Sequence, residues 1–229
     1  MFLLKICFVV VVLALIYHFA TKKYLNPYKL YLIFGKKGSG KSTLLTKLAL
    51  KYLKEGRPVF TTESIPGTYL IDAKTDIGEF EFPDRAVVLA DEVGSVWDNR
   101  RFKSFTDAQR DWFKLQRHRH ITVYLFSQTF DVDIKIRNLT DQMYLCKRFF
   151  RVFSVARRID RSIVLNNSTA DAPSSIDENL SFVPIWMPGA VKFTFIPAWT
   201  KYFDSFHAPK LLDKNFKYIP QLDTLSTEK

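Results

Sequence analysis

The stretch YLIFGKKGSGKSTLLTKLAL, residues 31–50, constrains the fold most, because it joins an apolar strand to an amphipathic helix through a glycine-rich turn. Its centre fits the pattern G-x-x-x-x-G-K-[S/T], in which backbone N–H groups and the start of the helix bind phosphate. Lys41 is expected to reach the β- and γ-phosphates, and the Ser42 hydroxyl is expected to bind Mg²⁺. The full set expected to bind nucleotide is Gly35, Lys36, Lys37, Gly38, Ser39, Gly40, Lys41, Ser42 and Thr43.

Two further apolar strands end in polar residues that suit nucleotide hydrolysis. The run AVVLADE ends in Asp91, expected to hold the magnesium ion, and Glu92, expected to polarise the attacking water. The run ITVYLFSQ ends in Gln128, expected to sense the γ-phosphate and position that water. Asp91 and Glu92 could instead be surface acids at a strand end, and Gln128 could be a glutamine that only forms a hydrogen bond at its strand end. The sequence contains no guanine-reading N-K-x-D motif, which favours ATP over GTP.

Strands and helices alternate along the first two thirds of the chain. Strands are expected at 29–34, 58–63, 86–92, 121–128 and 142–149, and helices at 41–55 and 106–118. This alternation predicts an α/β fold, a P-loop NTPase with a mostly parallel central sheet flanked by helices. After residue 148 the pattern indicates an antiparallel hairpin, a polar loop at 166–179 and short strands, forming an antiparallel β C-terminal extension.

The amino-terminal run FLLKICFVVVVLALIYHFA contains only two polar residues, Lys5 and His18. Its length is just enough for a transmembrane helix. An uncleaved anchor is favoured over a signal peptide, because no small-x-small cleavage site follows, and over a buried core element. Lysines follow the run, and because positive flanks stay cytoplasmic, we expect a single-pass membrane protein with a cytoplasmic body.

The expected organisation has three parts: a transmembrane anchor at 1–22, a P-loop ATPase core at 23–165, and a polar loop plus β-rich C-terminal extension of the same domain at 166–229. Cys7 and Cys146 are expected to be free thiols, which suits a reducing compartment.

Most of the net charge of +11 lies in the middle of the chain. Residues 100–161 carry fifteen Lys and Arg against six Asp and no Glu. Arg110, Lys114 and Arg117 recur at helical spacing, opposite a stripe of Ala108, Trp112 and Leu115. Such cations could contact the phosphates of a polynucleotide or form a solvated face. The candidates for an arginine finger are Arg117, Arg119 and Arg137. The histidines lack metal-ligand spacing, so we expect no metal beyond Mg²⁺.

The order of these motifs resembles the Zot (zonula occludens toxin-like) family of filamentous-phage assembly ATPases, within the FtsK/HerA P-loop group. The resemblance covers residues 28–165 and is carried by GKKGSGKS, GRPVFTT, VVLADEVGSVWDNRRF and QRHRHITVYLFSQTFDVDIKIRNLTDQMYLCKR. It implies a RecA/FtsK-like fold, the cofactors ATP and Mg²⁺, and an ATPase in the host inner or cytoplasmic membrane. That enzyme would extrude single-stranded phage DNA during virion assembly, as a homo-oligomeric ring with other phage assembly proteins.

By motif match, the resemblance gives Lys41 and Ser42 the phosphate and Mg²⁺, Asp91 the metal, Glu92 the role of base and Gln128 that of sensor. Many members carry the membrane span after the ATPase domain, whereas here the apolar run comes first. One alternative is a genome-packaging ATPase of a membrane-containing virus. Another is a non-motor membrane-bound nucleotide-binding scaffold, which Glu92 disfavours because a switch needs no fast base.

Overall fold

A computed structural model of the chain describes residues 2–21, 24–98, 105–166 and 175–202. Within these ranges, nine strands form one sheet in the order β3-β2-β4-β5-β1-β6-β7-β8, and β9 also pairs with β7. The strands are β1 Leu30–Phe34, β2 Val59–Thr61, β3 Tyr69–Leu70, β4 Val87–Ala90, β5 Thr122–Ser127, β6 Gln142–Phe149, β7 Phe153–Asn166, β8 Ser175–Phe182 and β9 Val191–Phe195. The helices are α1 Phe2–Thr21, α2 Lys41–Lys54, α3 Val93–Val96, α4 Asp107–Leu115 and α5 Ile134–Leu139, followed by the 3₁₀ turns η2 Ile196–Ala198 and η3 Thr200–Tyr202.

Strands β1 to β6 are all parallel, which confirms the predicted α/β class with a mostly parallel sheet. Every residue of β4 and β5 is buried, as expected for strands with packed layers on both faces. On the face of the sheet that α2 covers, Leu45, Phe126 and Tyr144 pack together. On the opposite face, Trp97 and Trp112 pack with residues of the central strands. Because the strands run the same way, their carboxyl ends meet at one edge of the sheet.

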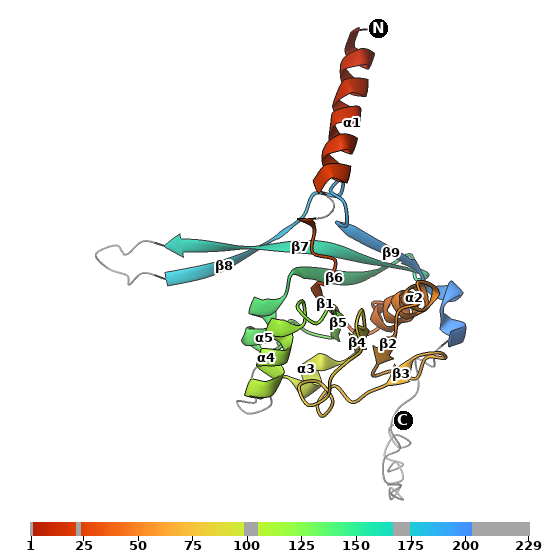
Figure 1. Cartoon of the computed structure of the whole chain (residues 1–229), viewed down its shortest axis with the longest axis vertical. Helices are drawn as coiled ribbons and strands as arrows, with labels where there is room; N and C mark the ends of the chain where they lie inside the picture. Colours follow the sequence, from red (N-terminus) through yellow and green to blue (C-terminus); the bar gives the residue numbers. More distant parts are fainter. Residues whose placement is uncertain (1, 22–23, 99–104, 167–174, 203–229) are drawn as a thin grey trace, which may run out of the picture.

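The antiparallel part of the sheet is built around the long strand β7. It pairs with β6, β8 and β9, all antiparallel. In Figure 1 the outer part of β7 and strand β8 extend away from the body as a two-stranded ribbon. The predicted polar loop at 166–179 is therefore too long, because Ser175 already pairs with Asn166. The ladder extends over polar residues that the hydrophobic pattern does not mark as a strand.

The amino-terminal residues form helix α1, which projects from the body in Figure 1. In the described part of the chain, no helix combines the length and apolarity needed to cross a bilayer. This finding overturns the predicted single-pass location in the host inner or cytoplasmic membrane, and it does not support the expected N-terminal transmembrane helix.

Helix α4 buries a different face from the one predicted. Its buried side chains are Gln109, Trp112 and Phe113, whereas Ala108 and Leu115 are exposed. The buried Gln109 amide accepts a hydrogen bond from Trp97 Nε1 at 3.1 Å, which turns a polar residue towards the core. The helix ends at Leu115, so the predicted helical stripe breaks before its last arginine.

Candidate nucleotide-binding site

The phosphate loop lies between β1 and α2, as the sequence pattern predicts. Gly38 and Gly40 have φ angles of 75° and 90°, in the left-handed region that glycine adopts without strain. A Cβ atom on Gly40 would lie 2.6 Å from Ser154 Cβ, so the loop is packed directly against β7. The loop leads into the amino terminus of the 14-residue helix α2, where backbone N–H groups favour an anion.

Side chains on strands β6 and β7 form hydrogen bonds to the Ser39 carbonyl of the phosphate loop. Ser154 Oγ donates to this oxygen at 2.9 Å, and Cys146 Sγ donates to it at 3.4 Å. Burial raises the pKa of the Cys146 thiol, which keeps its proton available for this bond. Both cysteines are free thiols, as expected. The loop conformation therefore depends on residues more than a hundred positions away in the sequence.

The Lys41 ammonium is turned into the loop and is only 7% exposed. Its Nζ donates to the carbonyl oxygens of Gly35 at 2.8 Å and Lys36 at 3.2 Å. Burial lowers the pKa of Lys41, and the nearby Asp91 carboxylate opposes that shift. The arrangement puts a positive charge where the phosphate loop would hold the β- and γ-phosphates.

Asp91 follows β4 and meets the start of α2. Its Oδ2 accepts a hydrogen bond from Ser42 Oγ at 2.9 Å, and its Oδ1 accepts one from the Glu92 N–H at 2.8 Å. The Asp91 N–H donates to Thr62 Oγ1 at 2.8 Å, which fixes the end of the strand. Burial raises the pKa of Asp91, whereas the hydrogen bonds from the Glu92 N–H and Ser42 Oγ and the charge of Lys41 lower it. A hydroxyl and a carboxylate are thus paired as oxygen ligands that suit Mg²⁺.

Glu92 and Gln128 come together from neighbouring strands. Gln128 Nε2 donates to Glu92 Oε1, and both side chains are exposed. Glu92 has a φ of 51°, a left-handed conformation that strains a non-glycine residue by about 1–2 kcal/mol. Strain of this kind is concentrated at functional sites. The two polar strand ends that the sequence singled out are therefore side by side.

A cavity of about 540 Å³ joins these parts, a size ordinary for a small-molecule site. The carbonyl oxygens of Gly35 and Lys36 accept hydrogen bonds from Lys41 Nζ, and Ser39 is buried beneath the phosphate loop. The lining residues that the sequence predicted are Lys37, Gly38, Gly40, Lys41, Ser42, Thr43, Asp91, Glu92 and Gln128.

Three residues that line the cavity were missed: Arg148, Ile196 and Thr200. The place of Arg148 follows from the register of β6, in which Leu145 pairs with Phe34, the last residue before the phosphate loop, and this register is not visible in the sequence. Ile196 and Thr200 follow β9, and no motif marks them. They reach the cavity because β9 pairs with β7, a contact that local sequence does not encode.

The three arginines chosen as finger candidates lie elsewhere. Arg117 and Arg119 are in the exposed turn before β5, at the end of the sheet opposite Gln128. Since β5 has six residues, that separation is about 20 Å. Arg137 is on α5, with its guanidinium 4.5 Å from the centre of the Phe130 ring. None of the three is among the residues that line the nucleotide cavity.

The chain's own residues fit a magnesium nucleotide. Lys41 and the glycine-rich turn before α2 supply donors that match phosphate. The Ser42 hydroxyl and the Asp91 carboxylate, 2.9 Å apart, supply oxygen ligands that match Mg²⁺.

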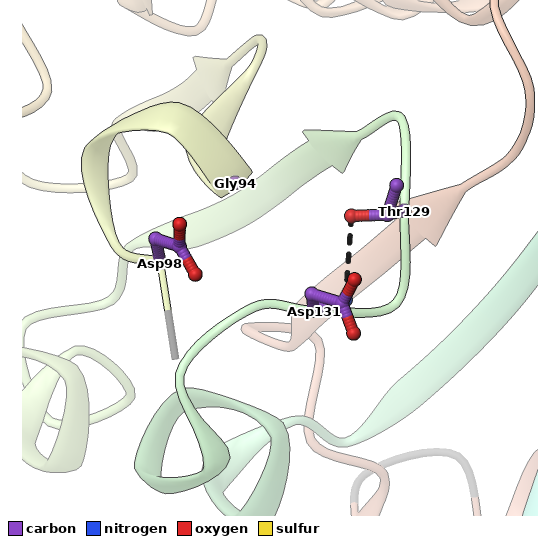
Figure 2. A pocket seen from close by; sticks show the side chains of 4 residues that line it. All are labelled: Gly94, Asp98, Thr129 and Asp131. Atoms are coloured by element: carbon purple, nitrogen blue, oxygen red, sulfur yellow. Dashed lines mark hydrogen bonds between the residues drawn. The ribbon is translucent and has the colours of Figure 1, made fainter. Parts of the chain in front are cut away.

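A smaller polar hollow of about 110 Å³ lies beside this site, lined by Gly94, Asp98, Thr129 and Asp131. Figure 2 shows the two carboxylates on separate segments, with the Asp131 N–H donating to Thr129 Oγ1 at 3.4 Å. Asp98 also forms an isolated antiparallel bridge with Val132. This bridge ties the segment after α3 to the loop after β5, and so helps to hold Glu92 near Gln128.

Comparisons with known proteins agree with this fold. No protein-family model and no curated protein matches the sequence. Among solved structures, the N-terminal domain of zonular occludens toxin from Neisseria meningitidis superposes with a TM-score of 0.50 at 19% identity, covering 77% of this chain and 99% of that one.

Two other solved structures superpose less well. The genome-packaging NTPase of Sulfolobus turreted icosahedral virus 2, in complex with AMP, has a TM-score of 0.40 at 17% identity, over 53% of this chain and 76% of that one. The flagellar accessory protein FlaH from Methanocaldococcus jannaschii has a TM-score of 0.42 at 14% identity, over 57% and 77%. The fold of this chain is similar to that of the zonular occludens toxin N-terminal domain, which confirms for the fold the resemblance expected from the motifs.

Proposed function

We propose that this chain is a magnesium-dependent ATPase of the Zot-like or viral genome-packaging type. The observation that carries the proposal is the 2.9 Å hydrogen bond between Ser42 Oγ and Asp91 Oδ2. It joins the phosphate loop to the acidic strand end inside the cavity that Glu92 and Gln128 also line. This combination of a phosphate site, a metal-binding pair and a carboxylate beside a glutamine suits hydrolysis of a nucleoside triphosphate.

The loop and the polar residues at the strand ends have distinct roles in the proposed reaction. Bound Mg²⁺ would neutralise charge on the β- and γ-phosphate oxygens. The loop N–H groups and Lys41 hold the phosphates, while Ser42 and Asp91 hold the metal and its water shell. Glu92 accepts a proton from the attacking water, and Gln128 orients that water through its amide. Arg148 adds a further positive charge at the cavity wall.

We further propose that hydrolysis drives the movement of DNA, in phage extrusion and virion assembly or in genome packaging. The basic segment from residue 100 to 161 supports this choice, and so does the resemblance of the motif order to the Zot family. A homo-oligomeric ring with other phage assembly proteins is part of the same proposal. Residues 23–165 would form the catalytic core, with 166–229 as an extension of the same domain.

The direct test is ATP binding and hydrolysis by the full chain in Mg²⁺. The parent protein is expected to hydrolyse ATP, and Lys41→Ala is expected to abolish binding. Glu92→Gln should bind ATP with unchanged affinity and lose at least 100-fold in turnover, the lower range for a general base. Unchanged turnover in Glu92→Gln would exclude this base. Binding without any turnover in the parent chain would favour the non-motor nucleotide-binding scaffold.

The proposed substrate is tested with single-stranded DNA, duplex DNA and no DNA in parallel. We expect DNA to stimulate hydrolysis, and the stimulation to decrease steeply as salt increases, because phosphate contacts release counterions. Preference for single strands would support extrusion, and preference for duplex would support packaging. Stimulation by neither would leave an ATPase whose basic segment is only a solvated face.

A further inference from the structure

The nucleotide cavity has two chemically different ends. Glu92 and Gln128, at the ends of β4 and β5, lie on one side of the phosphate loop. Arg148, Ile196 and Thr200 lie on the other side, beyond β1. Because the γ-phosphate must lie beside the residues that bind Mg²⁺ and activate water, the ribose and base extend towards the second end. The base is therefore expected to meet the 3₁₀ turns η2 and η3.

Ile196 gives this end of the cavity an apolar surface. A Cβ atom on Gly40 would lie 3.5 Å from Ile196 Cδ1, so the side chain is in contact range of the phosphate loop. The segment is anchored: Ile196 N–H donates to Val152 O at 2.8 Å, and Lys47 Nζ on α2 donates to the carbonyl of Phe193 on β9. Figure 1 shows both turns, in blue, beside α2. A half-buried aliphatic side chain in this place suits the face of a flat ring.

Thr200 gives the same end a hydrogen-bonding group of one kind. Its Oγ1 donates to Pro197 O at 3.2 Å. In this arrangement the lone pairs of the oxygen are free to accept a further hydrogen bond. Adenine carries an amino group, a donor, at position 6, whereas guanine and hypoxanthine carry a carbonyl oxygen, an acceptor. An accepting oxygen beside position 6 matches the amino group of adenine and is repelled by the carbonyl oxygen of the other two bases.

We propose that Ile196 and Thr200 form the base-binding wall of the site, and that Thr200 selects adenine. Ile196 packs on the ring face, and Thr200 Oγ1 accepts a hydrogen bond from the 6-amino group. The inference rests on the proposed function, because it requires a nucleotide on the phosphate loop. It goes further in assigning a role to a segment after β9 that no motif marks. One hydrogen bond of this kind corresponds to about a fivefold change in affinity.

The test is calorimetric titration of the full chain in Mg²⁺ with ATP, ITP, GTP and inorganic tripolyphosphate. The parent chain is expected to bind ATP about fivefold more tightly than ITP and GTP. Thr200→Val should remove this preference, and Thr200→Ser, which keeps the hydroxyl, should retain it. Ile196→Ala should weaken all three nucleotides by about the same factor. Both changes should leave the affinity for tripolyphosphate unchanged, because that anion has no base.

Thr68→Val is the matched control. Thr68 Oγ1 donates to Ile65 O, three residues earlier, as Thr200 does to Pro197, but Thr68 does not line the cavity. It should leave the preference for ATP intact. Equal binding of ATP and ITP by the parent chain, or a preference that survives in Thr200→Val, would overturn the inference. Failure of both ATP and tripolyphosphate to bind the parent chain would overturn the proposed function as well, and so the two failures are distinguishable.

Discussion

At the scale of single residues, two glycines of the phosphate loop differ in their surroundings. Both have positive φ angles, but a Cβ atom on Gly38 would meet nothing within 4 Å, whereas one on Gly40 would clash with Ser154. In Gly38→Ala the free energy of unfolding should therefore decrease only by the strain of a left-handed alanine, about 1–2 kcal/mol. Gly40→Ala should lower the free energy of unfolding further, because the loop must also move away from β7.

Urea unfolding and ATP titration check this pair. We expect Gly40→Ala to lower the free energy of unfolding by about 3 kcal/mol and to abolish detectable ATP binding, since overpacking adds to the backbone strain. Gly38→Ala should keep measurable binding. Equal losses in the two variants would mean that Ser154 can move aside and that the contact does not shape the loop.

The side chain of Lys192 is an unfavourable charge in the folded protein. Burial, with repulsion from neighbouring lysines, lowers its pKa from 10.5 to about 8. Because the folded pKa is below the unfolded one, the charge destabilises the fold fully below pH 8. This effect disappears as the pH rises from about 8 towards 10.5. Its Nζ lies 5.2 and 4.8 Å from the ring centres of Tyr31 and Tyr144, cation–π contacts that offset part of the loss.

Lys192→Met should consequently stabilise the protein at pH 7. We expect a gain of about 1–2 kcal/mol after the lost cation–π contacts, and little gain at pH 10. Thermal unfolding at pH 7 and pH 10 measures the gain in stability. Lys74 is exposed, so Lys74→Met is the control and should leave the stability unchanged at both pH values. A gain of equal size at both pH values would indicate packing rather than charge.

At the scale of elements, helix α4 depends on a polar network at its amino terminus. Thr106 Oγ1 accepts from the Gln109 N–H, and Gln109 Oε1 accepts from the Thr106 N–H, forming a capping box. Gln109 also accepts from Trp97 and donates to Lys74 O at 2.8 Å. The Gln109 amide thus connects the helix to two distant segments, whereas Thr106 serves only the helix end.

Removing the two residues should therefore have unequal effects. Thr106→Ala is expected to lower the free energy of unfolding by about 1 kcal/mol, the usual value of a cap. Gln109→Leu should lower it by about 2–4 kcal/mol, because the Trp97 N–H and the Lys74 carbonyl lose their partner. Urea unfolding compares them. A larger loss for Thr106→Ala would show that the cap, and not the buried amide, holds α4 in place.

The same helix shows why sequence periodicity predicted its existence but not its orientation. The pattern assigned apolar residues to the buried face, so Ala108 and Leu115 were expected inside. Gln109 is buried instead, because its hydrogen bonds to residues outside the helix compensate for the loss of water. Such partners are distant in the chain, and periodicity within one element carries no information about them.

At the scale of the whole molecule, the sheet separates the basic turn before β5 from the nucleotide cavity. Arg117 and Arg119 lie about one strand length, roughly 20 Å, from Gln128. If they complete an active site, it must be that of a neighbouring subunit. Arg148 lines the cavity of its own chain and would act there.

A mixing experiment distinguishes the two arrangements. Lys41→Ala and the double variant Arg117→Ala/Arg119→Ala should each be inactive alone, and their mixture should recover hydrolysis, because mixed neighbours restore complete sites. A mixture of Lys41→Ala with Arg148→Ala should stay inactive, since both changes affect the same cavity. Recovery in neither mixture would exclude a finger from the turn before β5.

The sequence alone determined the parallel α/β class and the meeting of the phosphate loop with Asp91, Glu92 and Gln128 at one edge of the sheet. Apolar strands, glycine spacing and the polarity of strand ends are local properties, and parallel strands bring their carboxyl ends together. The pairing of β7 with β6 and β9 decided that Arg148, Ile196 and Thr200 border the same cavity, and that Ser154 supports the loop. These contacts join residues far apart in the chain, and their free energy depends on three-dimensional packing that no local pattern records.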